Sequence, residues 1–115
     1  MSETQEPKVV KVLEKSGKVN EEIDWQVAKH VQSLGGYTPC QPSLVELENG
    51  QQVIKYLIDK TVIKKDGLYG YGIVGSIYVS IEPLGIMWIT PNDILEKKSE
   101  ELIQTAQPQK RPRIY

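Results

Sequence analysis

The chain has 115 residues, which suffices for one hydrophobic core, and its content of 39% hydrophobic and 25% charged residues is typical of a folded domain. The formal net charge of -1 excludes a molecule-wide field that would draw the chain to nucleic acid or to an anionic membrane. No apolar run approaches the roughly 18 residues of a membrane span, and the single Cys40 forms no intrachain disulfide. We therefore expect a cytoplasmic protein without membrane contact.

Residues 1–18 begin with an acidic stretch and then alternate Lys and Glu around the apolar residues 9–13. The apolar patch fits either an edge strand or part of a short helix. We expect this segment to be a mobile N-terminal extension and the folded domain to span residues 19–106.

A first helix is predicted over residues 21–34. Asn20 is a favourable N-cap, two glutamates follow it, and Gly35 with Gly36 supplies a stop. At 100° per residue, an apolar stripe that includes His30 falls on one face, which we expect to meet the core. Trp25 lies on the opposite side of this helix.

An antiparallel sheet is predicted after the helix. Residues 37–42 contain Pro39 and Pro42 and are interpreted as an extended connector. Hairpin turns are predicted at Asn49–Gly50 and at Asp66–Gly67, and a further turn at residues 83–85. The runs between these turns have the period of strands, which predicts an antiparallel meander of four to five strands.

A second helix is predicted from Thr90, as a hydroxyl N-cap followed by Pro91, to about Ala106. Residues 107–115 have no periodicity and form a basic tail. The predicted fold class is thus α+β: an N-terminal helix, an antiparallel meander and a C-terminal helix, with flexible termini.

Residues 70–75 read Gly-Tyr-Gly-Ile-Val-Gly, a match to the G-x-G-x-x-G pattern of phosphate-binding loops. A dinucleotide site needs a helix directly after the glycines, but residues 76–81 alternate with a strand period. The partners of a protein-kinase loop are also missing, since no lysine occurs between Lys65 and Lys97. We interpret the motif as a glycine-rich strand that lets another element pack closely, with Gly70 and Gly72 on one face.

No residue set predicts a reaction, a metal site or a cofactor. His30 is interpreted as a core histidine and Cys40 as a small core residue. One His and one Cys, separated by two glycines, do not make a zinc site. Whether the chain is an enzyme stays open, although the absence of a catalytic constellation favours a non-catalytic role.

Three hypotheses for function follow. The leading one is a binding or regulatory domain that acts through protein contacts, with Trp25, Tyr69 and Tyr71 as partner-binding residues and a homodimer as its assembly. The second is a nucleic-acid accessory protein that uses its tail, namely Lys110, Arg111, Arg113 and Tyr115. The third is a small-ligand binder or small enzyme with a pocket between helix and sheet, lined by His30, Tyr69 and Tyr71.

Overall fold

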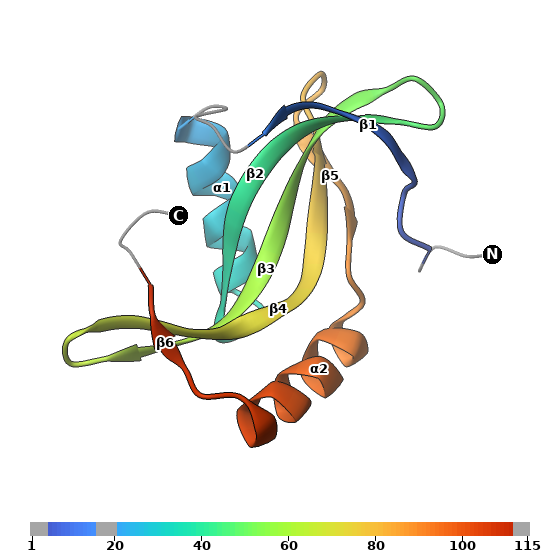
Figure 1. Ribbon diagram of the computed structural model, residues 1–115. Helices are drawn as coiled ribbons and strands as arrows, with labels where there is room; N and C mark the ends of the chain where they lie inside the picture. The colour runs from blue at the N-terminus through green and yellow to red at the C-terminus, as the bar shows by residue number, and fades with distance from the viewer. Residues whose placement is uncertain (1–4, 16–20, 112–115) are drawn as a thin grey trace.

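The computed structural model describes residues 5–15 and 21–111. Its elements in chain order are β1 (Val9–Lys15), α1 (Glu21–Gln32), β2 (Tyr37–Leu47), β3 (Gln52–Lys64), β4 (Gly67–Ser80), β5 (Gly85–Ile89), α2 (Asn92–Thr105) and β6 (Gln109–Lys110) (Figure 1). The strands form one antiparallel sheet in the order β1-β2-β3-β4-β5, and β6 pairs with β4. The α+β class and the antiparallel meander are confirmed.

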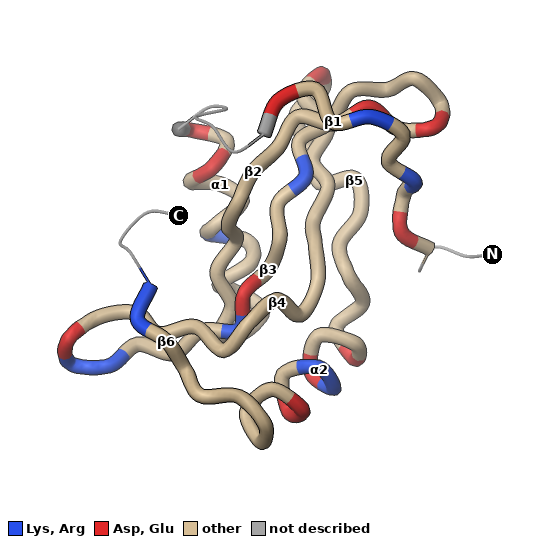
Figure 2. The backbone as a smooth tube through the Cα atoms, viewed as in Figure 1, with Lys and Arg blue, Asp and Glu red and all other residues tan. Residues whose placement is uncertain are grey.

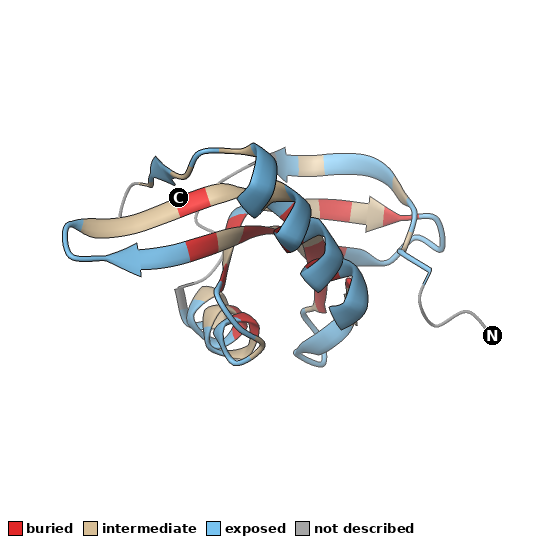
Figure 3. Cartoon of the chain, turned by 90° about the horizontal axis from the view of Figure 1, so that it is seen from below, coloured by how far each residue is buried: buried red, intermediate tan, exposed pale blue. Residues whose placement is uncertain are grey.

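The core lies between the sheet and the two helices, which cover the same sheet face (Figure 3). Val27 and Val31 of α1 and Leu95 of α2 are buried against the inward side chains of β3 and β4. A smaller apolar cluster on the opposite face contains Tyr78 and the half-buried Trp88. Within the described residues, neither helix has the length and apolar character that a membrane crossing needs.

The sheet takes in parts of both segments that the sequence analysis set outside the domain. β1 pairs antiparallel with Ser43–Leu47 of β2, so the apolar patch of the N-terminal segment is an edge strand. Near the other end of the chain, Lys110 pairs with Tyr69 of β4, and Arg111 donates its backbone N–H to the carbonyl of Leu68. The reason is that both segments can satisfy their main-chain groups against free strand edges.

Helix α2 begins one residue later than its predicted capping pattern requires. Its N-cap is Pro91, not Thr90, and no side chain caps it. The Thr90 hydroxyl instead accepts a hydrogen bond from the backbone N–H of Ser76, at 2.9 Å. Thr90 is buried there, so tertiary contact with β4 takes precedence over the local helix signal.

The two prolines of residues 37–42 do not exclude this segment from the sheet, contrary to the prediction. Gly36 accepts a hydrogen bond from Thr61, and the register pairs Pro39 with Ile58. The alternation of an antiparallel ladder then directs the main-chain groups of Thr38 and Cys40 toward β3 and those of Tyr37 and Pro39 away from it. Pro39 is tolerated because its nitrogen faces the open edge, where no ladder bond is lost.

Candidate functional site

The glycine motif lies inside β4, and two of its glycines, Gly70 and Gly72, lie next to a carboxylate of the chain itself. Asp59 is 1% exposed; one of its oxygens accepts the backbone N–H of Gly72 at 3.0 Å and the other the Nε–H of Arg111 at 3.0 Å. A Cβ added to Gly70 would stand 2.2 Å from Arg111 Nε and 2.3 Å from Asp59 Oδ2. Gly70 therefore leaves the space in which this ion pair forms.

The other two glycines of the motif make room for α2. A Cβ on Gly72 would meet Leu102 at 3.4 Å, and one on Gly75 would meet Leu95 at 2.7 Å. Gly70 and Gly72 do not share a face, contrary to the prediction, because the pairing with β3 skips Tyr71 between them; a second skip follows at Val74. Each such β-bulge shifts the alternation of side chains by one residue.

Part of the basic tail packs against the folded domain. The side chain of Arg111 is held at Asp59, and Lys110 is exposed on β6. Figure 2 shows a basic stretch of chain at the end of β6. Arg113 and Tyr115, which the nucleic-acid hypothesis also invoked, fall outside the described residues. Of the tail cations in the described part, Lys110 is the exposed one and Arg111 pairs with a carboxylate, so support for that hypothesis is reduced.

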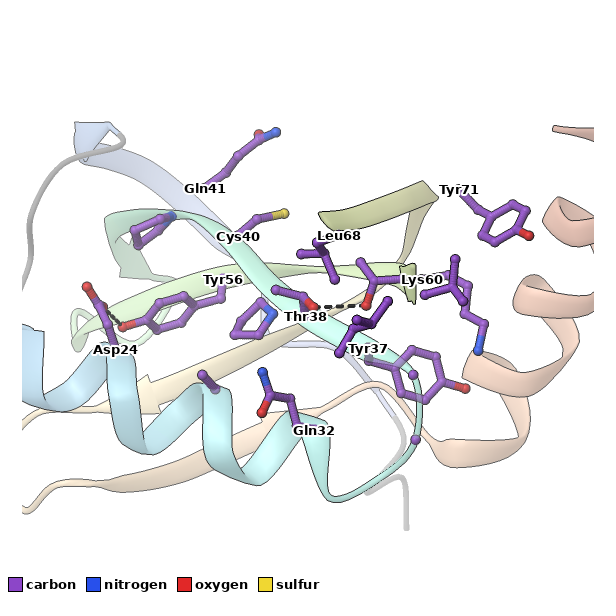
Figure 4. Close-up of a pocket in the computed structure, with 18 of the residues that line it drawn as sticks. Asp24, Gln32, Tyr37, Thr38, Cys40, Gln41, Tyr56, Lys60, Leu68 and Tyr71 are labelled. Carbon is purple, nitrogen blue, oxygen red and sulfur yellow. Dashed lines mark hydrogen bonds between the residues drawn. The ribbon is translucent and has the colours of Figure 1, made fainter. Parts of the chain in front are cut away.

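A groove of about 1250 Å³ follows the open edge of β2 between α1 and the projecting hairpin of β3 and β4 (Figure 4). It exists because β1 pairs only with Ser43–Leu47. Within the described part of the chain, Tyr37–Cys40 pair on one side alone, with β3, and residues 41–42 lie at the register shift that follows. Ala28 and Gln32 of α1 line one wall, and Leu68 and Ile63 of the hairpin line the other. The groove therefore reaches both faces of the β2 edge.

At Tyr37 and Pro39 the floor of the groove presents hydrogen-bond acceptors rather than donors. The carbonyls of Tyr37 and Pro39 point away from β3, as the ladder alternation requires. The N–H of Tyr37 is already bonded to the carbonyl of Gly35 at 2.8 Å, and Pro39 and Pro42 have no N–H. A ligand that lies along this edge must bring its own donors.

Four of the polar side chains in the groove are paired with one another. Tyr56 donates its hydroxyl hydrogen to Asp24, and the hydroxyls of Thr38 and Thr61 are 2.9 Å apart. Burial, and then the hydrogen bond to Asp24, raise the pKa of Tyr56 well above its usual value, so this hydroxyl stays protonated. These pairs leave the groove mainly apolar, as is usual for binding sites.

Cys40 lines the groove as a free thiol but is 1% exposed. Burial, with a further contribution from Asp59, raises the pKa of the thiol to about 12. The nucleophilic thiolate is therefore scarce at neutral pH. The structure bears out the interpretation of Cys40 as a core residue.

The predicted site residues do not come together in one place. Tyr71 lines the groove, whereas Tyr69 and His30 are not among its lining residues. Tyr69 donates its hydroxyl hydrogen to Asp66 at 2.7 Å, and His30 is half-buried on α1. Trp25 is 65% exposed, with the ammonium of Lys29 over its ring at 5.0 Å.

The open edge of β2 is the site feature that the sequence analysis missed. Its one local signal was a pair of prolines three residues apart, which also fits a loop. A stretch that contains prolines but is flanked by strand-like sequence is typical of an edge strand. That alternative interpretation would have identified the edge.

Comparison with known proteins gave no match. No protein-family model matches the chain, and no curated protein or solved structure matches it significantly. Among the described residues, no group of three or more His, Cys, Asp or Glu is placed to hold a metal ion. Arguments about function therefore rest on the geometry of the groove and of the sheet.

Proposed function

We propose that this chain is a cytoplasmic, non-catalytic domain that binds an extended segment of a partner protein in the groove beside β2. The observation that carries the proposal is the open edge at Tyr37–Pro42, with an apolar wall on either side. Strand edges of this kind are a recurring site of peptide recognition.

The shape of the groove favours an extended chain. The open edge continues the line of β1, whose last residue pairs with Ser43. Successive side chains of a strand point to opposite faces. Alternate side chains of an extended segment placed there would therefore contact Ala28 and Gln32 on one wall, and the intervening side chains would contact Leu68 and Ile63 on the other. A rounded small molecule would use only one of these walls.

Recognition is expected to depend on side chains more than on the backbone. The carbonyls of Tyr37 and Pro39 accept two N–H groups of the incoming segment, but neither residue returns a donor, since the N–H of Tyr37 is bonded to Gly35 and Pro39 has none. Ile63 is 83% exposed, and its full burial would contribute roughly 1.5–3 kcal/mol. We therefore expect the partner segment to carry apolar anchor residues at alternate positions.

Selection of peptides from a random display library tests this function. We expect enrichment of peptides with apolar residues at alternate positions, and Ile63→Lys should weaken their binding about tenfold through loss of apolar contact. Val10→Lys is the matched control, because Val10 is an exposed apolar strand residue, 54% accessible, outside the groove lining. If no peptide is enriched, or if both variants weaken binding equally, the groove is not the binding site.

Self-association remains part of the proposal, and we assign it to the β5 edge. Ile86 and Met87 on this short strand are 44% and 38% exposed, and Leu84 of the preceding turn is 44% exposed. An apolar edge strand with free main-chain groups favours antiparallel pairing with a second copy. This interface is separate from the groove.

Light scattering at tens of micromolar should then give twice the chain mass of 13.0 kDa for the wild type. Ile86→Lys should give the monomer mass, because a buried lysine at the two-fold contact is unfavourable. Val12→Lys, which changes an exposed residue of the opposite edge strand β1, should leave the dimer intact. A monomeric wild type would rule out the dimer.

A further inference from the structure

A second cluster of polar groups lies away from the groove, on the sheet face opposite the helices. There the carboxylate of Glu6 accepts hydrogen bonds from the hydroxyl of Tyr78 at 2.5 Å and from the hydroxyl of Ser76 at 3.0 Å. The ammonium of Lys55 is 3.8 Å from the same carboxylate oxygen, Oε2. Three donors therefore converge on one acceptor.

The donors and the acceptor differ in how firmly the fold holds them. Tyr78 and Ser76 are 1% and 5% exposed and lie on β4, which is paired on both sides within the sheet. The Glu6 side chain is 46% exposed and belongs to the segment that precedes β1. The donor set is thus part of the sheet, whereas the carboxylate comes from a peripheral segment.

A fourth donor in this region has no partner. The indole N–H of Trp88 is buried and makes no hydrogen bond within the described structure. Trp88 is the cross-strand neighbour of Tyr78, with the two rings edge to face at 5.9 Å. An unsatisfied buried donor is uncommon in folded proteins, and it often marks a place for a missing ligand or water.

Trp88 also lines a pocket of about 390 Å³ together with Glu6, Ser76 and Lys98. Apart from Glu6, the polar side chains that line the pocket can all donate hydrogen bonds, namely those of Ser76, Trp88, Thr90 and Lys98, and the rest of the lining has no polar side chain. Tyr78 and Lys55 do not line the pocket but contact Glu6. Glu6 is the one carboxylate among the residues that line it. Such a set selects an anionic oxygen ligand.

We propose that this pocket is a carboxylate-binding site in which Glu6 is an intramolecular occupant that an external carboxylate can replace. The chain's own side chain demonstrates that a carboxylate fits the hydroxyls of Ser76 and Tyr78. Glu6 uses Oε2 for all three contacts and leaves the Trp88 N–H unsatisfied. An external carboxylate that lies deeper in the pocket would bring a second oxygen to this indole.

This arrangement makes the segment before β1 a regulator of the site. Because Glu6 is tethered, its effective concentration at the donors is on the order of millimolar or above. An external carboxylate therefore competes poorly until the segment is displaced. The site does not depend on the groove beside β2, so either proposal can fail without the other.

The site is tested by titration of wild type and Glu6→Ala with sodium acetate while the indole N–H resonances are recorded by NMR. Sodium chloride at equal ionic strength is the control. The chain has two tryptophans, so Trp25 serves as an internal reference that lies outside the pocket. We expect acetate to shift the Trp88 indole resonance of Glu6→Ala saturably and to leave that of Trp25 unchanged. Wild type should need about tenfold more acetate for the same shift.

A second probe and a second variant identify the class of ligand. A blocked glutamate, N-acetylglutamate amide, should act like acetate if an acidic side chain is the natural ligand, whereas a response to acetate alone indicates a small free acid. Tyr78→Phe in the Glu6→Ala background should weaken the acetate response severalfold. Glu6→Gln preserves the length and packing of the side chain and replaces Glu6→Ala if the latter does not fold.

The site is refuted if folded Glu6→Ala and Glu6→Gln both give no saturable acetate shift at Trp88. A shift with inorganic phosphate but not with acetate would refute the assignment to carboxylates.

Discussion

Replacement of Gly70 by alanine is expected to lower the free energy of unfolding by about 3 kcal/mol, the scale on which disruption of a buried ion pair destabilises proteins. The added Cβ would lie 2.2 Å from Arg111 Nε and 2.3 Å from Asp59 Oδ2, closer than atoms can approach. Because Asp59 is fully buried, it cannot move into solvent, and the pair must break or the strand must shift. Urea denaturation of wild type and variant measures the difference.

Gly85→Ala is the matched control for this prediction. Gly85 also lies in a strand, but a Cβ there would meet only the Ser80 hydroxyl oxygen, at 3.9 Å. We expect its effect to stay within about 0.5 kcal/mol, as for most surface substitutions. Equal stabilities of Gly70→Ala and Gly85→Ala would contradict the role given to Gly70.

Asp59→Ala is expected to destabilise the fold by about 3–5 kcal/mol, the range for a buried ion pair that loses one partner. The carboxylate joins three separate parts of the chain, since Asp59 is on β3, Gly72 on β4 and Arg111 follows β6. Its loss removes one acceptor from the Gly72 N–H and one from the half-buried guanidinium. Thermal or urea unfolding provides the measurement.

Asp59→Asn separates the two contacts of the carboxylate. The amide oxygen can still accept the hydrogen bond from the Gly72 N–H, but the negative charge that attracts Arg111 is removed. We therefore expect the free energy of unfolding to fall by less than it does with alanine. In a double-mutant cycle, Asp59→Asn and Arg111→Ala together should lower the free energy of unfolding by clearly less than the sum of the decreases from the two single variants. Strict additivity would mean that Arg111 does not depend on Asp59.

The elements that the sequence predicted correctly are those with strong local signals. The hairpin turns at Asn49–Gly50 and Asp66–Gly67 come from residues that adopt positive φ or bond their own backbone, as Gly50 does with a φ of 88°. The apolar stripe of α1 follows directly from helical periodicity, and Val27 and Val31 are in the core. The glycine motif was correctly assigned to a strand because residues 76–81 have a strand period.

What the sequence did not predict depends on contacts between distant residues. Asp59 and Arg111 are 52 positions apart, and Glu6 and Tyr78 are 72 apart, so no local pattern relates them. The bulges at Tyr71 and Val74 exist only relative to the partner strand β3, and the one at Tyr71 places Gly70 and Gly72 on opposite faces. The groove beside β2 arises because β1 covers only part of β2, which strand propensities do not determine.

The central claim is that an extended partner segment lies beside Tyr37–Pro42. The most direct measurement is the set of intermolecular nuclear Overhauser effects between a selected peptide and the methyl groups of the protein. We expect contacts to Ile63 and Leu68 on one wall and to Ala28 on the other, with an extended peptide backbone. Contacts that gather instead at Ile86 on β5 or at Ile94 on α2 would contradict it.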